Sequence, residues 1–295
     1  MKNALFTAAL VAVIVSCTSI PLIAKGPEKL KPVKAEDIKK MEEAAPEKAP
    51  AKPLKKRKIL VLWRCDGFFH KCIPVANKCI EILGKKTGAY ECVIPETASE
   101  QMDWLSADKL KDFDAIVFNN TTRLNPNADQ QKALMDFVKG GKGFIGIHAA
   151  SDNFYKWPEG AAMVGGLFAG HPWTAGGTWA FKVENPDNPV NASFKGKGFK
   201  AKDEIYNLKD PYTRKDRRIL ISLDMDDPAT GKKKGRKDRD QAVAWIKKCG
   251  EGRVFYCSLG HNNQIFWTPD IVAHYLAGIQ YAIGDLKADD TPVEK

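Results

Sequence analysis

The sequence contains no pair of cysteines separated by two residues, although it has seven cysteines in total. Structural zinc sites are typically built from such closely spaced pairs, so a zinc site of this kind is not expected. Six of the cysteines follow the N-terminal segment, at positions Cys65, Cys72, Cys79, Cys92, Cys249 and Cys257. Cys79 falls in a predicted amphipathic helix, and Cys92 and Cys257 fall in apolar strands, where buried free thiols are common.

The N-terminal segment lacks an apolar run long enough to span a membrane comfortably. Its short run after Lys2 is typical of a secretory signal, so we expect residues 1–24 to be a signal peptide and the protein to be exported to a bacterial periplasm. The order Ile14-Val15-Ser16-Cys17 is that of a bacterial lipobox, which would make Cys17 a lipidated anchor on the membrane. The alternative is soluble export, with cleavage after Ala24.

Large apolar side chains are almost absent from residues 25–57, which consist mainly of Lys, Glu, Pro and Ala. Such a composition buries too little apolar surface to offset the entropy cost of ordering the chain. We therefore expect residues 25–57 to form a disordered linker.

The positive charge is concentrated in two segments of the sequence, which is not the distribution expected of a surface that binds a nucleic-acid backbone. Residues 25–58 carry 12 basic and 6 acidic side chains, residues 231–240 carry 6 and 2, and together they account for the whole net charge of +10. The rest of the chain sums to zero, so no nucleic-acid partner is expected.

Apolar runs alternate with segments of helical periodicity from residue 58 onward. The strands predicted first are 58–63, 90–94, 114–118 and 143–147, and the helices between them are 74–86, 106–113 and 127–139. This alternation predicts a parallel sheet with helices on both faces. Beyond residue 176 an antiparallel extension is expected, with strands at 178–184, 204–208, 218–223, 242–246 and 253–258, closed by a helix at 269–283. The chain shows no second core.

Polar side chains collect directly after these strands. In a doubly wound sheet, loops that follow the strands converge and form the ligand site. Four of the five histidines lie in such loops or in the stretch GGLFAGHPW, namely His70, His148, His171 and His261. Histidine is the natural general base near neutral pH and the commonest metal ligand, so these four form a candidate site. His274 lies within the last helix and is expected to be structural.

Several ordered motifs carry a resemblance to a known family. They are GFIGIHAASDNFYKWP at 143–158, GGLFAGHPW at 165–173, DEIYNL at 203–208 and GRVFYCSLGHNNQIFW at 252–267. Through these motifs the chain resembles the ThuA-like (trehalose utilisation) family over residues 57–285. We therefore expect a ThuA-like domain at 58–285 and a C-terminal tail at 286–295. The resemblance implies a flavodoxin-like fold related to class I glutamine amidotransferases. His148 stands where those enzymes present a nucleophilic cysteine, so amidotransferase activity is not expected.

The resemblance also implies a function in carbohydrate metabolism. We expect an exported hydrolase or lyase that acts on a glycoside or 3-keto-glycoside, with a divalent metal ion and no nucleotide cofactor. The catalytic candidates are His148, Asp152 and Glu204, and the candidate metal ligands are His148, His171 and His261. Candidates for contact with the sugar are Asp66, His70, Asn120, Trp173 and Asn262.

Each candidate also has a structural interpretation. His171 and Pro172 would then only shape a turn, Asp152 would cap a helix, and Trp173 would pack in the interior. The alternative function is a non-catalytic carbohydrate-binding lipoprotein on the same fold. Cys65 follows the first strand but has only His70 near it along the chain, which argues against a nucleophile.

Overall fold

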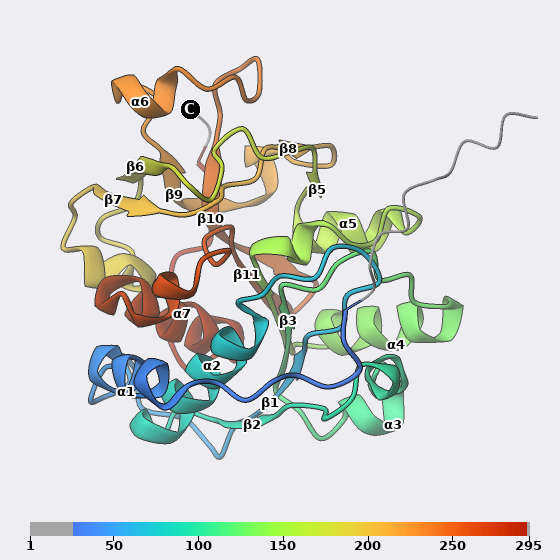
Figure 1. Cartoon of the computed structure of the whole chain (residues 1–295). Helices are drawn as coiled ribbons and strands as arrows, with labels where there is room; N and C mark the ends of the chain where they lie inside the picture. Colours follow the sequence, from blue (N-terminus) through green and yellow to red (C-terminus); the bar gives the residue numbers. More distant parts are fainter. Residues whose placement is uncertain (1–25, 294–295) are drawn as a thin grey trace, which may run out of the picture.

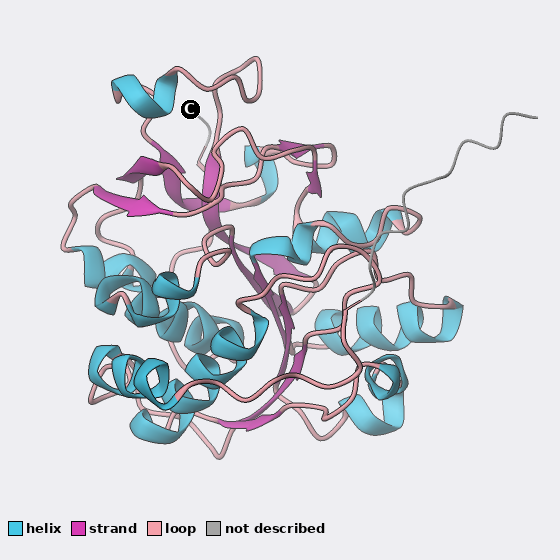
Figure 2. Cartoon of the chain, viewed as in Figure 1, coloured by secondary structure: helices cyan, strands magenta, loops and turns pink. Residues whose placement is uncertain are grey.

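Nine strands form one mixed sheet with helices on both of its faces in the computed structural model, which describes residues 26–293 (Figure 1 and Figure 2). In spatial order the strands are β2 (Glu91–Val93), β1 (Lys58–Leu62), β3 (Ala115–Asn119), β4 (Gly143–Ile147), β11 (Gly252–Cys257), β10 (Ala242–Cys249), β9 (Arg218–Leu223), β6 (Thr178–Val183) and β7 (Phe199–Lys202). The helices are α1 (Ala35–Ala44), α2 (Ile73–Thr87), α3 (Ala107–Leu110), α4 (Ala128–Lys139), α5 (Pro158–Val164), α6 (Pro228–Gly231) and α7 (Pro269–Ala282). A separate small sheet pairs β5 (Leu167–Phe168) with β8 (Leu208–Lys209).

The sheet changes from parallel to antiparallel at β11. Strands β2, β1, β3, β4 and β11 pair in parallel, and β10, β9, β6 and β7 each pair antiparallel with the preceding neighbour. The predicted α/β fold with a parallel sheet and an antiparallel extension is confirmed. The five parallel strands direct their carboxyl ends to one edge, where the loops that carry the candidate residues meet.

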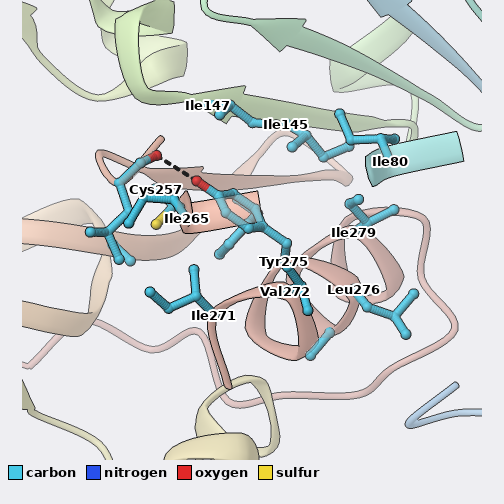
Figure 3. Close-up of a cluster of buried hydrophobic side chains, with 14 of the residues drawn as sticks. Ile80, Ile145, Ile147, Cys257, Ile265, Ile271, Val272, Tyr275, Leu276 and Ile279 are labelled. Atoms are coloured by element: carbon cyan, nitrogen blue, oxygen red, sulfur yellow. Dashed lines mark hydrogen bonds between the residues drawn. The ribbon is translucent and has the colours of Figure 1, made fainter. Parts of the chain in front are cut away.

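Helices cover both faces because the central strands are apolar on both sides. Ile59 and Val61 of β1 belong to a core shared with α2 and α7, whereas Leu60 and Leu62 belong to the core on the opposite face. Figure 3 shows the first of these cores, in which Tyr275 and Ile279 of α7 lie with the isoleucines of β4. This alternation along one buried strand is the pattern expected for a sheet covered on both sides.

Local signals in the sequence set the ends of the long helices. Helix α2 begins with Pro74 in its first turn and ends at Gly88, whose φ of 68° is left-handed. Helix α4 begins with a capping box in which the Asn127 side chain accepts from the Gln130 backbone N–H and the Gln130 side chain accepts in return from Asn127. These ends explain why the predicted helix boundaries agree with the structure.

The expectation of a disordered linker does not hold for residues 26–57. Helix α1 lies within them and packs against α2 and the 3₁₀ turn η5 (Asn263–Trp267), and it buries Met41, which is 1% exposed. Ahead of it, the Gly26 N–H donates to the Cys65 carbonyl, and Leu30 packs beside Trp63. Composition did not predict this order, because a few apolar side chains can hold a segment in place when they pack on the surface of an already folded domain.

A second difference concerns the predicted strand at 204–208. The structure instead has β7 at Phe199–Lys202 and β8 at Leu208–Lys209, and between them only Ile205 forms an isolated bridge, with Trp173. Glu204 therefore lies in a loop. The expected signal peptide and lipidation site, residues 1–24 with Cys17, lie outside the described residues, and within residues 26–293 no helix has the length and hydropathy needed to cross a membrane.

Candidate metal centre

His148 stands at the sharp turn where β4 passes into the 3₁₀ turn η2 (His148–Ser151). Its φ of 45° is unusual for a residue with a side chain, and its carbonyl accepts a hydrogen bond from the Tyr256 hydroxyl at 2.7 Å. The imidazole is completely buried, and its Nδ1 lies 2.6 Å from the Ser258 carbonyl. A carbonyl can only accept, so Nδ1 carries a proton, and Nε2 is the nitrogen that remains for the centre.

Three more side chains meet His148 from separate loops. One ring nitrogen each of His70, His148 and His261 and one carboxylate oxygen of Glu204 lie within 4.8 Å of one another. His70 follows β1, Glu204 follows β7 and His261 follows β11. The sequence positions span almost two hundred residues, and only the convergence of strand ends brings them together.

The hydrogen-bond pattern of the three rings fits a metal ion. Nδ1 of His70 and Nε2 of His148 are buried without a hydrogen-bond partner, and Nδ1 of His261 lies 3.2 Å from Oε1 of Glu204. The opposite nitrogen of His70 lies 3.4 Å from the Tyr206 hydroxyl, and that of His148 is held by Ser258. A ligating histidine commonly donates its other ring N–H to such an outer group. Three imidazoles and one carboxylate suit a divalent first-row metal.

Glu204 is the charged member of this centre. Its Oε1 lies 3.2 Å from Nδ1 of His261 and 3.7 Å from Nε2 of His148. Burial by itself would raise the pKa of Glu204, but the interactions with His148 and His261 outweigh it and hold this pKa well below its usual range. The carboxylate is therefore ionised at neutral pH and available as a ligand.

The surroundings of the centre shift the pKa values of His70 and His261 in opposite directions. Burial, followed by the nearby His148 and His261, lowers the pKa of His70 to about 2, so this ring is neutral. Burial also acts to lower the pKa of His261, but Glu204 more than compensates and the pKa of His261 is raised. A cation placed among these groups would stabilise the neutral, ligating forms of the rings.

Asp203 is a supporting residue that the sequence analysis did not identify. Its completely buried carboxylate accepts backbone N–H groups from Gly260 at 2.6 Å, from His261 at 3.1 Å and from Asn262 at 2.8 Å. Gly260 has a φ of 126°, which favours glycine, and the turn brings His261 to the centre. The acidic pair Asp203-Glu204 was visible in the sequence, but nothing there shows that one carboxylate holds the loop and the other faces the histidines.

Tyr206 is a second residue that was missed. Its ring lies 4.3 Å from that of His148, centroid to centroid, and its hydroxyl is within reach of His70. Burial raises the pKa of Tyr206 well above its ordinary value, so the hydroxyl stays protonated. Tyr206 therefore fixes the orientation of two histidines at once.

His171, predicted as a metal ligand, lies beside the cluster of four and not within it. Its Nδ1 is 3.3 Å from Oε2 of Glu204, the side chain is about half exposed, and the ring stacks on Phe168. His70, predicted only to contact the substrate, occupies the place expected for His171. Because His171 is exposed and contacts Glu204, it marks the side from which solvent reaches the centre.

Three predicted sugar contacts are engaged in the protein interior or its turns. Trp173 is completely buried and donates its indole N–H to the Thr230 carbonyl, so its ring offers no face to a sugar. The Asn262 side chain donates to the Ala175 and Lys202 carbonyls. Asn120 is buried with a φ of 53°, and its Oδ1 has no partner.

Two predicted site carboxylates, Asp152 and Asp66, form ion pairs with arginines. Asp152 accepts from the Tyr155 hydroxyl at 2.5 Å and pairs with Arg123 at 3.1 Å, so it does not orient the His148 imidazole, which Ser258 does. Asp66 forms an ion pair with Arg64 at 2.9 Å and stays partly exposed near His70.

Cys65 is buried, and its thiol contacts the Asn120 carbonyl at 3.3 Å. Burial raises the pKa of Cys65 to about 11. This environment disfavours the thiolate that a nucleophile requires.

The fold agrees with comparisons to known proteins. Residues 58–282 match the family described as ThuA, trehalose utilisation, and the chain belongs to that family. The description of the family indicates a role connected with sugars. No curated protein matches the chain.

Solved structures show the same fold. A ThuA-like protein from Bacteroides uniformis is 22% identical, with 78% of this chain and 94% of that chain covered and a TM-score of 0.61. A second, from Parabacteroides merdae, is 18% identical, with 83% and 93% covered and a TM-score of 0.59. A β-galactosidase from Bacillus circulans is similar over 80% of this chain but only 32% of its own, at 11% identity and a TM-score of 0.50.

Proposed function

We propose that this protein is an exported enzyme that cleaves a glycoside or 3-keto-glycoside at a site built on a divalent metal ion. The observation that carries the proposal is the convergence of one ring nitrogen each of His70, His148 and His261 with a carboxylate oxygen of Glu204 within 4.8 Å, two of these nitrogens being buried without a hydrogen-bond partner. Buried polar atoms normally have partners, and leaving Nδ1 of His70 and Nε2 of His148 unpaired in one place is costly without a ligand. The family's connection with sugars supports a carbohydrate substrate.

The ligands in this proposal are His70, His148, Glu204 and His261. When bound, the metal ion would supply Lewis acidity towards a carbonyl or hydroxyl oxygen of the sugar. The Ser258 carbonyl keeps the ring of His148 in the ligating tautomer, and the Tyr206 hydroxyl is placed to accept an Nε2–H of His70. Asp203 holds the loop that carries His261.

His171 is the proposed proton acceptor because it is the exposed histidine at this centre. Its Nδ1 faces Glu204, so proton transfer to and from a substrate would use Nε2. In a 3-keto-glycoside the ketone acidifies the hydrogen on C2. Removal of that proton by His171 leaves the C–H electron pair to form a C1–C2 double bond, while the C1–O bond breaks and the glycosidic oxygen departs and takes up a proton.

Metal analysis of variants tests this proposal. The chain from residue 25 onward is used, because residues 26–57 are part of the fold. We expect the parent to bind a stoichiometric amount of a divalent metal, His70→Ala and His148→Ala to lose it, and His171→Ala to retain it while losing turnover of keto-glycosides.

Two results would contradict the proposal. One is a parent without metal even after reconstitution with each divalent ion. The other is equal metal content in the parent and in His148→Ala. Sugar binding without metal and without turnover would instead favour the alternative, a carbohydrate-binding lipoprotein.

A further inference from the structure

Phe68 is an exposed aromatic side chain in direct contact with the candidate metal centre. Among residues 26–293 the exposed large apolar side chains are Leu54, Phe68 and Val293, and Phe68 is the only aromatic one. It is 60% exposed, and its ring meets that of His70 edge-on, with centroids 4.9 Å apart. A ligand that contacts His70 would therefore lie close to an exposed aromatic side chain.

The loop that carries Phe68 is firmly held. The Asp66 N–H donates to the Thr122 carbonyl at 2.8 Å, and the Thr122 hydroxyl donates to the Phe68 carbonyl at 2.9 Å. A Cβ atom at Gly67 would lie 2.5 Å from Cγ of Arg123, so the loop packs tightly on the residues after β3. The exposure of Phe68 is therefore fixed by the backbone and does not result from a loose loop.

The two residues that follow Phe68 are directed into the protein, whereas Phe68 is exposed. Phe69 packs against the small core of Trp63, Cys65 and Ile73, and His70 is 2% exposed at the metal centre. Single exposed apolar residues are common and need no explanation. Here the combination of a rigid loop, an outward aromatic ring and contact with a candidate ligand calls for one.

We propose that Phe68 is the residue on which a pyranoside ring of the substrate stacks at the entrance to the metal centre. The C–H groups on one face of a pyranose ring form an apolar surface that packs on an aromatic face, while its hydroxyl groups stay free for polar partners. The inference rests on the proposed function and adds the residue that selects a sugar ring over other polyols.

Binding measurements with Phe68→Ala and Phe68→Trp test this role, and Leu54→Ala is the matched control at a second exposed apolar side chain. The probes are trehalose, methyl glucoside and glycerol, which has hydroxyl groups but no ring face, each added to the metal-loaded chain. We expect Phe68→Ala to weaken binding of both sugars about tenfold, and Phe68→Trp and Leu54→Ala to bind as the parent does. Metal content and glycerol binding are expected to be unchanged in all three.

The results separate this inference from the proposed function. Unchanged sugar affinity in Phe68→Ala, an equal loss of glycerol binding, or a metal-loaded parent that binds neither sugar would each overturn the stacking role and leave the metal-centre proposal standing. A parent that binds no metal would overturn the proposed function, whatever the sugar affinities are.

Discussion

His274 on α7 should make the protein less stable below neutral pH. The ring is completely buried between Phe194 and Phe255, its Nδ1 lies 2.9 Å from the Val190 carbonyl, and its Nε2 has no partner. Burial lowers the pKa of His274 from 6.5 to about 4. The unfolded chain therefore binds more protons between these values, and stability is lost as the pH falls through this window.

The size of the effect follows from the two pKa values. Linkage from 6.5 in the unfolded chain to about 4 in the folded chain removes about 2 kcal/mol of the free energy of unfolding at about pH 5, and about 3 kcal/mol once the pH is below both values. The comparison variant is His274→Asn, because asparagine keeps an N–H donor for the Val190 carbonyl and does not titrate.

Urea unfolding of the parent and of His274→Asn, from about pH 7.5 to about pH 5, measures this difference. The stability advantage of the parent should shrink by about 2 kcal/mol over this range. Met41→Ala leaves His274 and its surroundings intact, so its deficit relative to the parent should not change with pH. A parent-to-Asn difference that is flat with pH would refute the assigned burial and protonation of His274.

Two further variants test other parts of the structure. Met41→Ala, at the 1% exposed contact between α1 and the domain, should lower the free energy of unfolding by about 2–3 kcal/mol; no change in urea unfolding would show that residues 26–57 do not pack as described. Asp203→Asn should release the loop at His261 and reduce metal affinity about tenfold or more, as measured by competition with a chelator. The control is Asp152→Asn, which should leave metal affinity unchanged because Asp152 pairs with Tyr155 and Arg123.

Much of the parallel half of the fold could be predicted because its signals are local. Runs such as Ile59–Leu62 are apolar on both faces, and the capping box at Asn127 and Gly88 at the end of α2 mark helix ends without reference to the rest of the chain. The later half was harder to predict, since β7 is only four residues long and depends on pairing with β6. Helix α1 was missed because its stability comes from packing Met41 on α2 and not from its composition.

For the candidate site, the sequence predicted which residue types take part and which loops carry them, but not how the side chains face one another. The sequence by itself determined that His70, His148 and His261 follow strands, and hence that they would gather at one edge of the sheet. Glu204 was expected within a strand, and only the structure shows that it follows β7. Tertiary structure decided which of them face one another: it placed His70 in the cluster, moved His171 to the rim and assigned the orienting roles to Ser258, Asp203 and Tyr206. The physical reason is that strand order fixes where a loop begins, whereas the direction of each side chain depends on hydrogen bonds and packing between residues that are distant in the sequence.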